Sequence, residues 1–225
     1  MTYRFQSLRS STIFSALIAA LILASAFTFP AQAKNGATYS DLNSFVESVR
    51  NGDGSALRGV YVQDRMAFQI VQQPAGSPAF VSQDPDQFTQ FGMAAEAGNI
   101  GLLAHNYLAG RSLSSLVQGD IVVLVYGDGH TESFLVKEIR QVQALDPSSP
   151  YSDFKDLGTQ ATLSVDELFR QAYKGARHVT FQTCIEANGD LSWGRLFVIA
   201  EPITEEVTSP TPENFINTFF GFWRR

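Results

Sequence analysis

Apolar residues recur along the chain in two patterns, and short extended runs outnumber helical ones. Residues 40–50 place apolar side chains at the spacing of an amphipathic helix. A capping box of Ser164 and Glu167 opens a second predicted helix, which Gly175 ends, and residues 146–160 are predicted to form a polar loop. Extended segments are predicted over residues 58–73, 99–104, 121–126, 131–142, 178–184 and 193–200. This pattern favours a mostly β barrel or sandwich that carries a few helices.

The first 33 residues have the pattern of a secretory signal peptide. Arg4 and Arg9 provide a basic start, an apolar run extends from about Ile13 to Phe29, and Ala31-Gln32-Ala33 is a small-x-small cleavage pattern. Cleavage after Ala33 is the favoured interpretation, and an uncleaved membrane anchor is the alternative. In both cases we expect the rest of the chain outside the cytoplasm, either secreted or on the outer face of the cytoplasmic membrane.

The remaining chain divides into three parts. Residues 34–57 are predicted to form a helical extension, and residues 58–205 a β domain. Residues 206–225 combine a proline-bearing linker with a tail rich in aromatic residues. The tail is too short to span a bilayer. It either packs on the domain or rests at a membrane interface, so membrane contact through the N-terminus or the tail stays open.

Composition excludes several functions. The chain has 225 residues and a formal net charge of −6, and this acidic balance argues against binding to nucleic acid. One cysteine excludes internal disulfides and Cys-rich zinc modules, and three histidines argue against a multi-His metal site. Ser82, Asp84 and Asp86 lack the spacing of a calcium loop, and a solvated acidic stretch explains them better. We therefore expect no cofactor, with calcium left open and no positions assigned to it.

A predicted hairpin places an arginine beside the only cysteine. Asn188-Gly189 lies between two extended runs and predicts a two-residue turn. In that register Cys184 faces Trp193, and Arg195 is its diagonal neighbour on the same face. A cation there stabilises a thiolate and can meet an oxyanion that develops on a substrate carbonyl. The alternatives are a surface salt bridge for Arg195, and for Cys184 either a buried, inert role or an intermolecular disulfide.

A thiol nucleophile also requires a base, and the chain offers three histidines. His130 is expected at an exposed hairpin tip. His178 lies six residues from Cys184 in the same predicted strand, about 20 Å away, which is too far for a hydrogen bond. His105 ends a buried run, where functional residues tend to lie. From spacing alone, a structural role explains His105 as well as a role as base.

Four segments of the chain resemble motifs of the sortase family, in the family's order. Gly98–Asn106 is similar to the segment that ends in the catalytic histidine of sortases, and Leu116–Tyr126 has their L-x-x-G-D entry to a strand. Thr180–Cys184 is similar to their TLxTC motif, and Gly194–Ala200 to the strand that supplies their catalytic arginine. The resemblance covers about residues 58–203. Three features depart from it: Phe181 replaces the usual Leu, Ala104 replaces the usual Gly, and the insert between His105 and Cys184 is long.

The resemblance implies a closed eight-stranded β-barrel with a few short helices and the activity of a cysteine transpeptidase. Cys184 would attack a sorting motif near the C-terminus of a surface protein and form a thioacyl-enzyme. His105 would protonate the leaving amine and deprotonate the amine acceptor, and Arg195 would steady the oxyanion or the peptide. With water as acceptor the enzyme would be a hydrolase. By strand parity Thr183 points away from Cys184 and is expected to support the site, and Trp193 either walls the site or packs across the strands.

Two other hypotheses remain open. One is a peptide-binding module on a sortase-like barrel with little or no turnover. The other is a structural β domain in which Cys184 fills the core.

Overall fold

The computed structural model describes residues 41–149 and 151–203. The predicted signal segment, the linker and the aromatic tail lie outside the described residues. Among residues 41–149 and 151–203, no helix has the length and apolar character that a membrane crossing requires.

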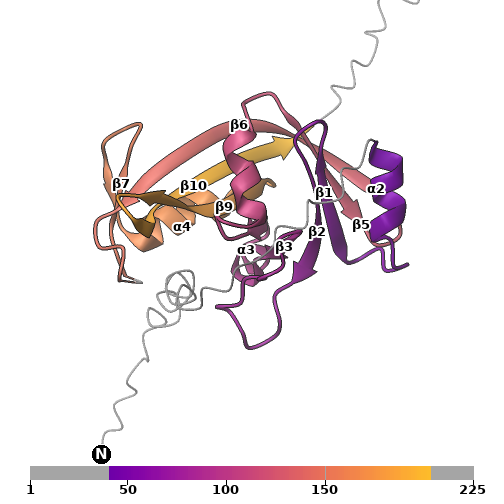
Figure 1. Ribbon diagram of the computed structural model, residues 1–225, viewed down its shortest axis with the longest axis horizontal. Helices are drawn as coiled ribbons and strands as arrows, with labels where there is room; N and C mark the ends of the chain where they lie inside the picture. The colour runs from indigo at the N-terminus through magenta and orange to yellow at the C-terminus, as the bar shows by residue number, and fades with distance from the viewer. Residues whose placement is uncertain (1–40, 150, 204–225) are drawn as a thin grey trace, which may run out of the picture.

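Strands dominate the described part of the chain (Figure 1). They are β1 (Leu57–Val62), β2 (Met66–Gln72), β3 (Gln87–Gln90), β4 (Ile100–Leu103), β5 (Ile121–Tyr126), β6 (Thr131–Ala144), β7 (Phe154–Asp156), β8 (Thr162–Leu163), β9 (Val179–Ala187) and β10 (Asp190–Pro202). The helices are α2 (Leu42–Val49), α3 (Gly92–Glu96) and α4 (Val165–Tyr173), with a 3₁₀ helix, η2 (Ala109–Ser115).

Eight of these strands close into a barrel. Their order is β10-β9-β4-β3-β2-β1-β5-β6, and β6 pairs back with β10. The pairs β2–β3 and β4–β9 are parallel, whereas the other pairs are antiparallel. β7 and β8 extend the sheet from β6, outside the closed ring. The prediction of a mostly β, closed eight-stranded barrel with a few short helices is therefore confirmed.

The alternation of side chains along the strands separates two apolar clusters. The inward cluster fills the barrel, and Phe88 lies at its centre with its ring centroid 5.7 Å from those of Phe68 and Phe181. The outward cluster joins β9 and β10 to α3, α4 and β7, and it contains Cys184 and Phe197. Cys184 therefore belongs to the layer that covers the barrel and not to the barrel interior.

The two predicted helices are both present. α2 buries Phe45 and Val49 at the end of the barrel away from β7 and α4, as Figure 1 shows. α4 begins as the capping box predicts, because the Ser164 hydroxyl accepts a hydrogen bond from the Glu167 amide. Its apolar stripe then packs on the outward face of the barrel.

The prediction of a polar loop over residues 146–160 is partly wrong, because that segment contains β7. Phe154 and Asp156 are buried there, and the strand pairs with the end of β6. β3 and η2 were not predicted either. All three elements are too short to show a clear periodic pattern in the sequence.

We expect Gly101→Ala to lower the free energy of unfolding by about 1–3 kcal/mol, because the added methyl overpacks the contact between β4 and its covering helices. A Cβ atom at Gly101 would lie 2.7 Å from the Cβ of Ala94 and 3.0 Å from Tyr173. Gly158→Ala is a matched control, since its Cβ would make ordinary contact at 3.4 Å. Urea unfolding measures both variants, and equal stabilities would contradict this account of the packing.

Candidate active site

Cys184 and Arg195 lie directly opposite each other on β9 and β10. Ala187 pairs with Asp190, as a two-residue turn requires, but the register then shifts before Gly194, and Arg195 pairs with Cys184. The predicted pairing of Cys184 with Trp193, and the diagonal position of Arg195, are therefore wrong. Because the shift adds two residues to β10, the parity is unchanged, and both side chains project from one face as predicted.

The register shift has a local cause in β10. The Asp190 carboxylate accepts a hydrogen bond from the Ser192 amide at 2.7 Å, which curls the backbone after the turn. Nη1 of Arg195 then donates to the carbonyl oxygens of Ser192 and Gly194 at 3.0 and 2.8 Å. A Cβ atom at Gly194 would lie 2.4 Å from the Val142 carbonyl oxygen, so only glycine lets β6 approach here.

Arg195 is a buried cation whose hydrogen-bonding capacity is only partly used. Its side chain is 1% exposed, and its guanidinium faces the Phe154 ring at 5.9 Å from the centroid. Among the described residues it has no carboxylate partner, and its Nε and Nη2 have no hydrogen-bond acceptor. The alternative of a surface salt bridge is therefore wrong. Two N–H donors beside a thiol are suited to a developing oxyanion.

Cys184 is 6% exposed, and its environment favours the protonated thiol. Burial raises the pKa of Cys184, the charge of Arg195 opposes this by lowering it, and Asp190 contributes a smaller upward effect. At neutral pH the sulfur is therefore a protonated thiol. The charge of Arg195 lowers the free energy needed to ionise it.

The parallel pair β4–β9 brings His105 to the same level as Cys184. Leu103 pairs with Gln182, and the Ala104 amide donates to the Gln182 carbonyl at 3.3 Å. His105 therefore leaves β4 beside the position of Cys184. The ring is 5% exposed, and burial lowers the pKa of His105, opposed by a hydrogen bond to the Val81 carbonyl.

The other two histidines lie elsewhere. His130 is half exposed at the β5–β6 turn, where its Nδ1 lies 2.6 Å from the Asp128 carboxylate. The ring nitrogens of His178 contact the carbonyl oxygens of Ala176 and Ala172 at 2.7 and 2.9 Å. His130 therefore lies at an exposed hairpin tip, as the sequence predicts.

Thr183 joins the two strands from the opposite face. Its hydroxyl donates to the Ala104 carbonyl at 2.8 Å, and both residues are buried. Gly110 packs against this contact so closely that a Cβ there would lie 2.4 Å from the Thr183 hydroxyl. Thr183 thus holds the backbone that presents His105, as its parity predicted.

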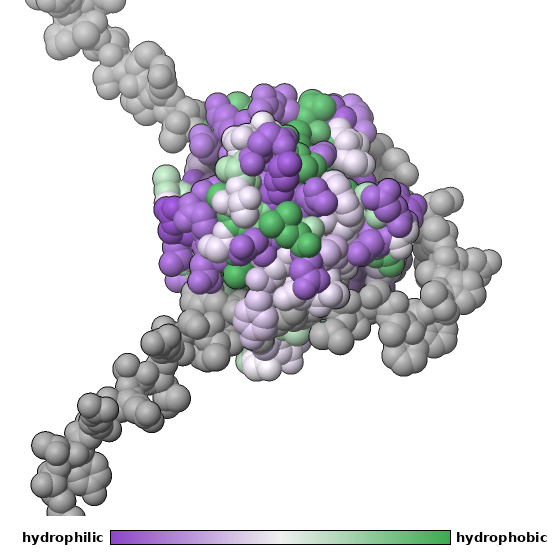
Figure 2. All heavy atoms as spheres, turned by 90° about the vertical axis from the view of Figure 1, so that its left-hand side faces the viewer, coloured by the Kyte–Doolittle hydropathy of each residue, from purple (hydrophilic) through white to green (hydrophobic). Residues whose placement is uncertain are grey.

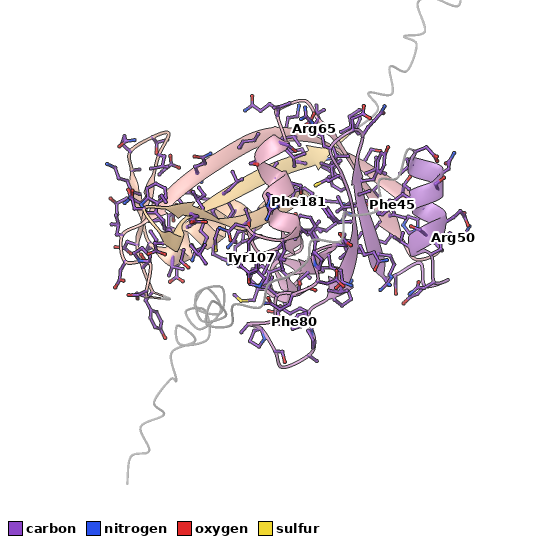
Figure 3. All side chains as sticks on the ribbon, in the orientation of Figure 1. Phe45, Arg50, Arg65, Phe80, Tyr107 and Phe181 are labelled. Atoms are coloured by element: carbon purple, nitrogen blue, oxygen red, sulfur yellow. The ribbon has the colours of Figure 1, made fainter. Side chains whose placement is uncertain are left out.

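Sequence reasoning did not single out Tyr107 and Gln83. The Tyr107 ring stacks on His105 with centroids 5.2 Å apart, and its hydroxyl donates to the Gln83 side-chain oxygen at 3.3 Å. Burial, and then the negative charge of a Cys184 thiolate, raise the pKa of Tyr107, so the phenol lies close enough to sense the sulfur. Figure 3 shows Tyr107 near Phe80 on the underside of the barrel. Tyr107 lies two residues after His105, and this proximity was a signal in the sequence that could have singled it out. Gln83 belongs to no motif, so no sequence pattern pointed to it.

The surroundings of the site are mainly polar. Figure 2 views the molecule from the side that carries β7 and shows a few apolar side chains among polar ones. The exposed large apolar side chains of the described residues include Leu145, Tyr151 and Leu191. Within the described ranges, no group of three or more His, Cys, Asp or Glu side chains is placed to hold a metal ion.

Comparisons with known proteins relate the fold to sortases. No family model matches the sequence, and no curated protein matches it. Sortase C-1 from Actinomyces oris is 12% identical with a TM-score of 0.45, covering 86% of this chain and 98% of that one. Sortase A from Listeria monocytogenes is 12% identical with a TM-score of 0.42, covering 66% and 87%. Sortase E1 from Streptomyces coelicolor, with a tripeptide in its active site, is 17% identical with a TM-score of 0.41, covering 69% and 91%. At these identities the likeness concerns the fold.

We expect the reaction of Cys184 with a small methanethiosulfonate reagent, which forms a mixed disulfide and releases methanesulfinate, to be slow at neutral pH and to accelerate above the ordinary thiol pKa of about 8.5. The reason is that burial raises the pKa of Cys184. Arg195→Met should move the profile to higher pH by about one unit, because the cation that favours the thiolate is lost. Arg50→Met, at the residue that follows α2, should leave the pH profile unchanged. As the chain has one cysteine, mass spectrometry reports this site alone. An Arg195→Met profile equal to that of the wild type would contradict the assignment.

We expect Thr183→Val to lower the free energy of unfolding by about 1–3 kcal/mol, because it leaves the Ala104 carbonyl buried without its donor. Thr183→Ser keeps the hydroxyl and should lose less. Chemical denaturation compares the two variants. A Val variant as stable as the Ser variant would show that the hydrogen bond does not secure the His105 segment.

Proposed function

We propose that the chain is a cysteine transpeptidase of the sortase type, in which Cys184, His105 and Arg195 form the catalytic centre. The observation that carries the proposal is the direct cross-strand pairing of Cys184 with a buried arginine that keeps two N–H donors uncommitted. A purely structural arginine at 1% exposure would be expected to use these donors, since unsatisfied buried polar groups destabilise the fold. The motif resemblance in the sequence supports the same assignment.

The proposed reaction is acyl transfer through sulfur. The Cys184 thiolate attacks the carbonyl carbon of a peptide bond in a sorting motif near the C-terminus of a surface protein. Nε–H and Nη2–H of Arg195 donate to the oxyanion of the tetrahedral intermediate. As the C–N bond breaks, His105 protonates the leaving amine and a thioacyl-enzyme remains. An amine acceptor then attacks the thioester and gives up a proton to His105, and the thiolate leaves. With water as acceptor, the same steps give hydrolysis.

The resting ionisation of the site has a consequence for this scheme. Burial raises the pKa of Cys184 and lowers that of His105, so thiol and imidazole are both neutral at neutral pH. Moving one proton from sulfur to imidazole creates the nucleophile and the acid together. Arg195 favours that transfer because its charge lowers the pKa of the thiol.

The second candidate function is a peptide-binding module with little or no turnover. The observation that favours it is the coverage of Cys184, which is 6% exposed beneath the outer cluster of apolar side chains. In this case the free donors of Arg195 would hold a peptide carbonyl without any attack by sulfur.

The proposed location is outside the cytoplasm, secreted or on the outer face of the cytoplasmic membrane. It rests on the basic start, the apolar run and the cleavage pattern of residues 1–33. The proposed partners are surface proteins with a C-terminal sorting motif and an amine acceptor, with no cofactor.

We expect the protein to ligate members of a library of C-terminal sorting peptides to an amine, measured by mass spectrometry. Cys184→Ala should abolish ligation, and Arg195→Ala should reduce kcat/KM by about 10²–10³-fold because an oxyanion donor is lost. Arg50→Ala, at the residue that follows α2, is the control and should retain full activity.

Ligation that persists in Cys184→Ala would refute the mechanism. Peptide binding that is unchanged in Cys184→Ala, with no ligation by the wild type, would establish the binding module instead.

A further inference from the structure

The loop that carries Gln83 is fixed to β3, although the Gln83 side chain itself is exposed. The Ser82 amide donates to the Thr89 hydroxyl at 2.8 Å, and the Ser82 hydroxyl donates to the Gln87 side chain at 2.8 Å. The Asp84 amide in turn donates to the Ser82 hydroxyl at 3.1 Å. Both neighbours of Gln83 are therefore held, and its amide projects from a defined backbone.

The amide of Gln83 completes a directed chain of hydrogen bonds at His105. The Tyr107 hydroxyl donates to Gln83 Oε1 at 3.3 Å, and Gln83 Nε2 lies 2.8 Å from His105 Nε2. An amide nitrogen only donates, so His105 Nε2 must accept and carry no proton. A neutral ring then carries its proton on the other nitrogen, Nδ1. With the amide in this orientation, every donor in the chain of hydrogen bonds faces an acceptor only when the imidazole is neutral.

We propose that Gln83 is a positioning residue for His105, and that its amide rotates when the imidazole gains or loses a proton. In the imidazolium, Nε2–H would face the amide N–H, a contact between two donors. A half-turn of the amide places Oε1 against the imidazolium and the amide N–H against the Tyr107 oxygen, which can accept as well as donate. Gln83 therefore offers a complete set of hydrogen bonds to both protonation states and keeps the ring in one orientation.

No acidic side chain of the described residues positions the His105 ring, so Gln83 is the side chain that does so. Tyr107 stacks on the His105 ring, and the register of β4 with β9 puts Cys184 at the level of His105. Arg195 pairs with Cys184 from β10. The carboxylate of Asp84, on the Gln83 loop, accepts from the Asp86 amide. No carboxylate of the described residues forms an ion pair with His105. A neutral amide thus stands where many catalytic histidines have an acid. The inference rests on the proton transfer by His105 proposed above.

The test follows the ring nitrogens of His105 by NMR as a function of pH, with His105→Ala to assign the signals. In the wild type at neutral pH we expect an unprotonated Nε2 and a protonated Nδ1. Gln83→Glu should raise the pKa of His105 by about one unit or more, because a carboxylate accepts from the imidazolium and cannot donate to the neutral ring. The matched control is Gln118→Glu, the same change of charge at an exposed position in the turn before β5.

A second variant removes the amide without adding charge. Gln83→Leu should lower kcat for ligation about tenfold with little change in KM, and Gln83→Glu should shift the pH profile of kcat/KM upward with the His105 titration. A wild-type ring protonated at Nε2 would overturn the inference. So would a Gln83→Glu protein in which His105 titrates as in Gln118→Glu. The NMR readout requires no turnover, so the expected tautomer and shift in a protein that ligates no peptide would uphold the inference and refute the proposed activity.

Discussion

The parallel pairing of β4 with β9 is the contact on which the candidate site depends. It joins the strand that ends at His105 to the strand that carries Cys184, and the Thr183 hydroxyl bonded to the Ala104 carbonyl secures the joint where β4 ends. Parallel neighbours require a long crossover. The chain between β4 and β9 uses that crossover to build β5, β6 and the covering layer of β7, β8 and α4. The pairing of β4 with β9 therefore sets the relative positions of His105 and Cys184, and its crossover supplies the layer of β7, β8 and α4.

The burial of Arg195 is the energetic counterpart of this geometry. A guanidinium without a carboxylate partner is costly to desolvate, and two backbone carbonyls and an aromatic face offset only part of that cost. Backbone carbonyls bind Nη1 and so fix the guanidinium, which sets the direction of the N–H groups of Nε and Nη2. No mobile side chain of the described residues takes part. A site of this kind is preorganised, since little rearrangement is required of the arginine when negative charge develops beside it.

Local patterns predicted most strands, both longer helices and the Asn188-Gly189 turn, because periodicity and capping act within a few residues. The hairpin register could not be predicted in the same way. It depends on the Asp190 carboxylate, on carbonyls turned toward Arg195 and on the approach of β6 to Gly194. The meeting of His105 with Cys184 follows from the strand order of a closed barrel, which spacing along the chain does not contain. Gln83 stayed unnoticed because its role arises from contacts across a loop that has no periodic pattern.

Closure of the ring has a consequence for the order in which the molecule acquires its chemistry. β10 pairs with β6 across separations as long as that from Pro202 to Phe134, whereas β9 and β10 meet through a two-residue turn. Local hairpins form early in folding, and distant strand pairs form late. The thiol and the guanidinium can therefore become neighbours before the imidazole and the covering layer arrive. Until the ring closes the sulfur lacks its covering layer, and in the closed barrel Cys184 is only 6% exposed to oxidants.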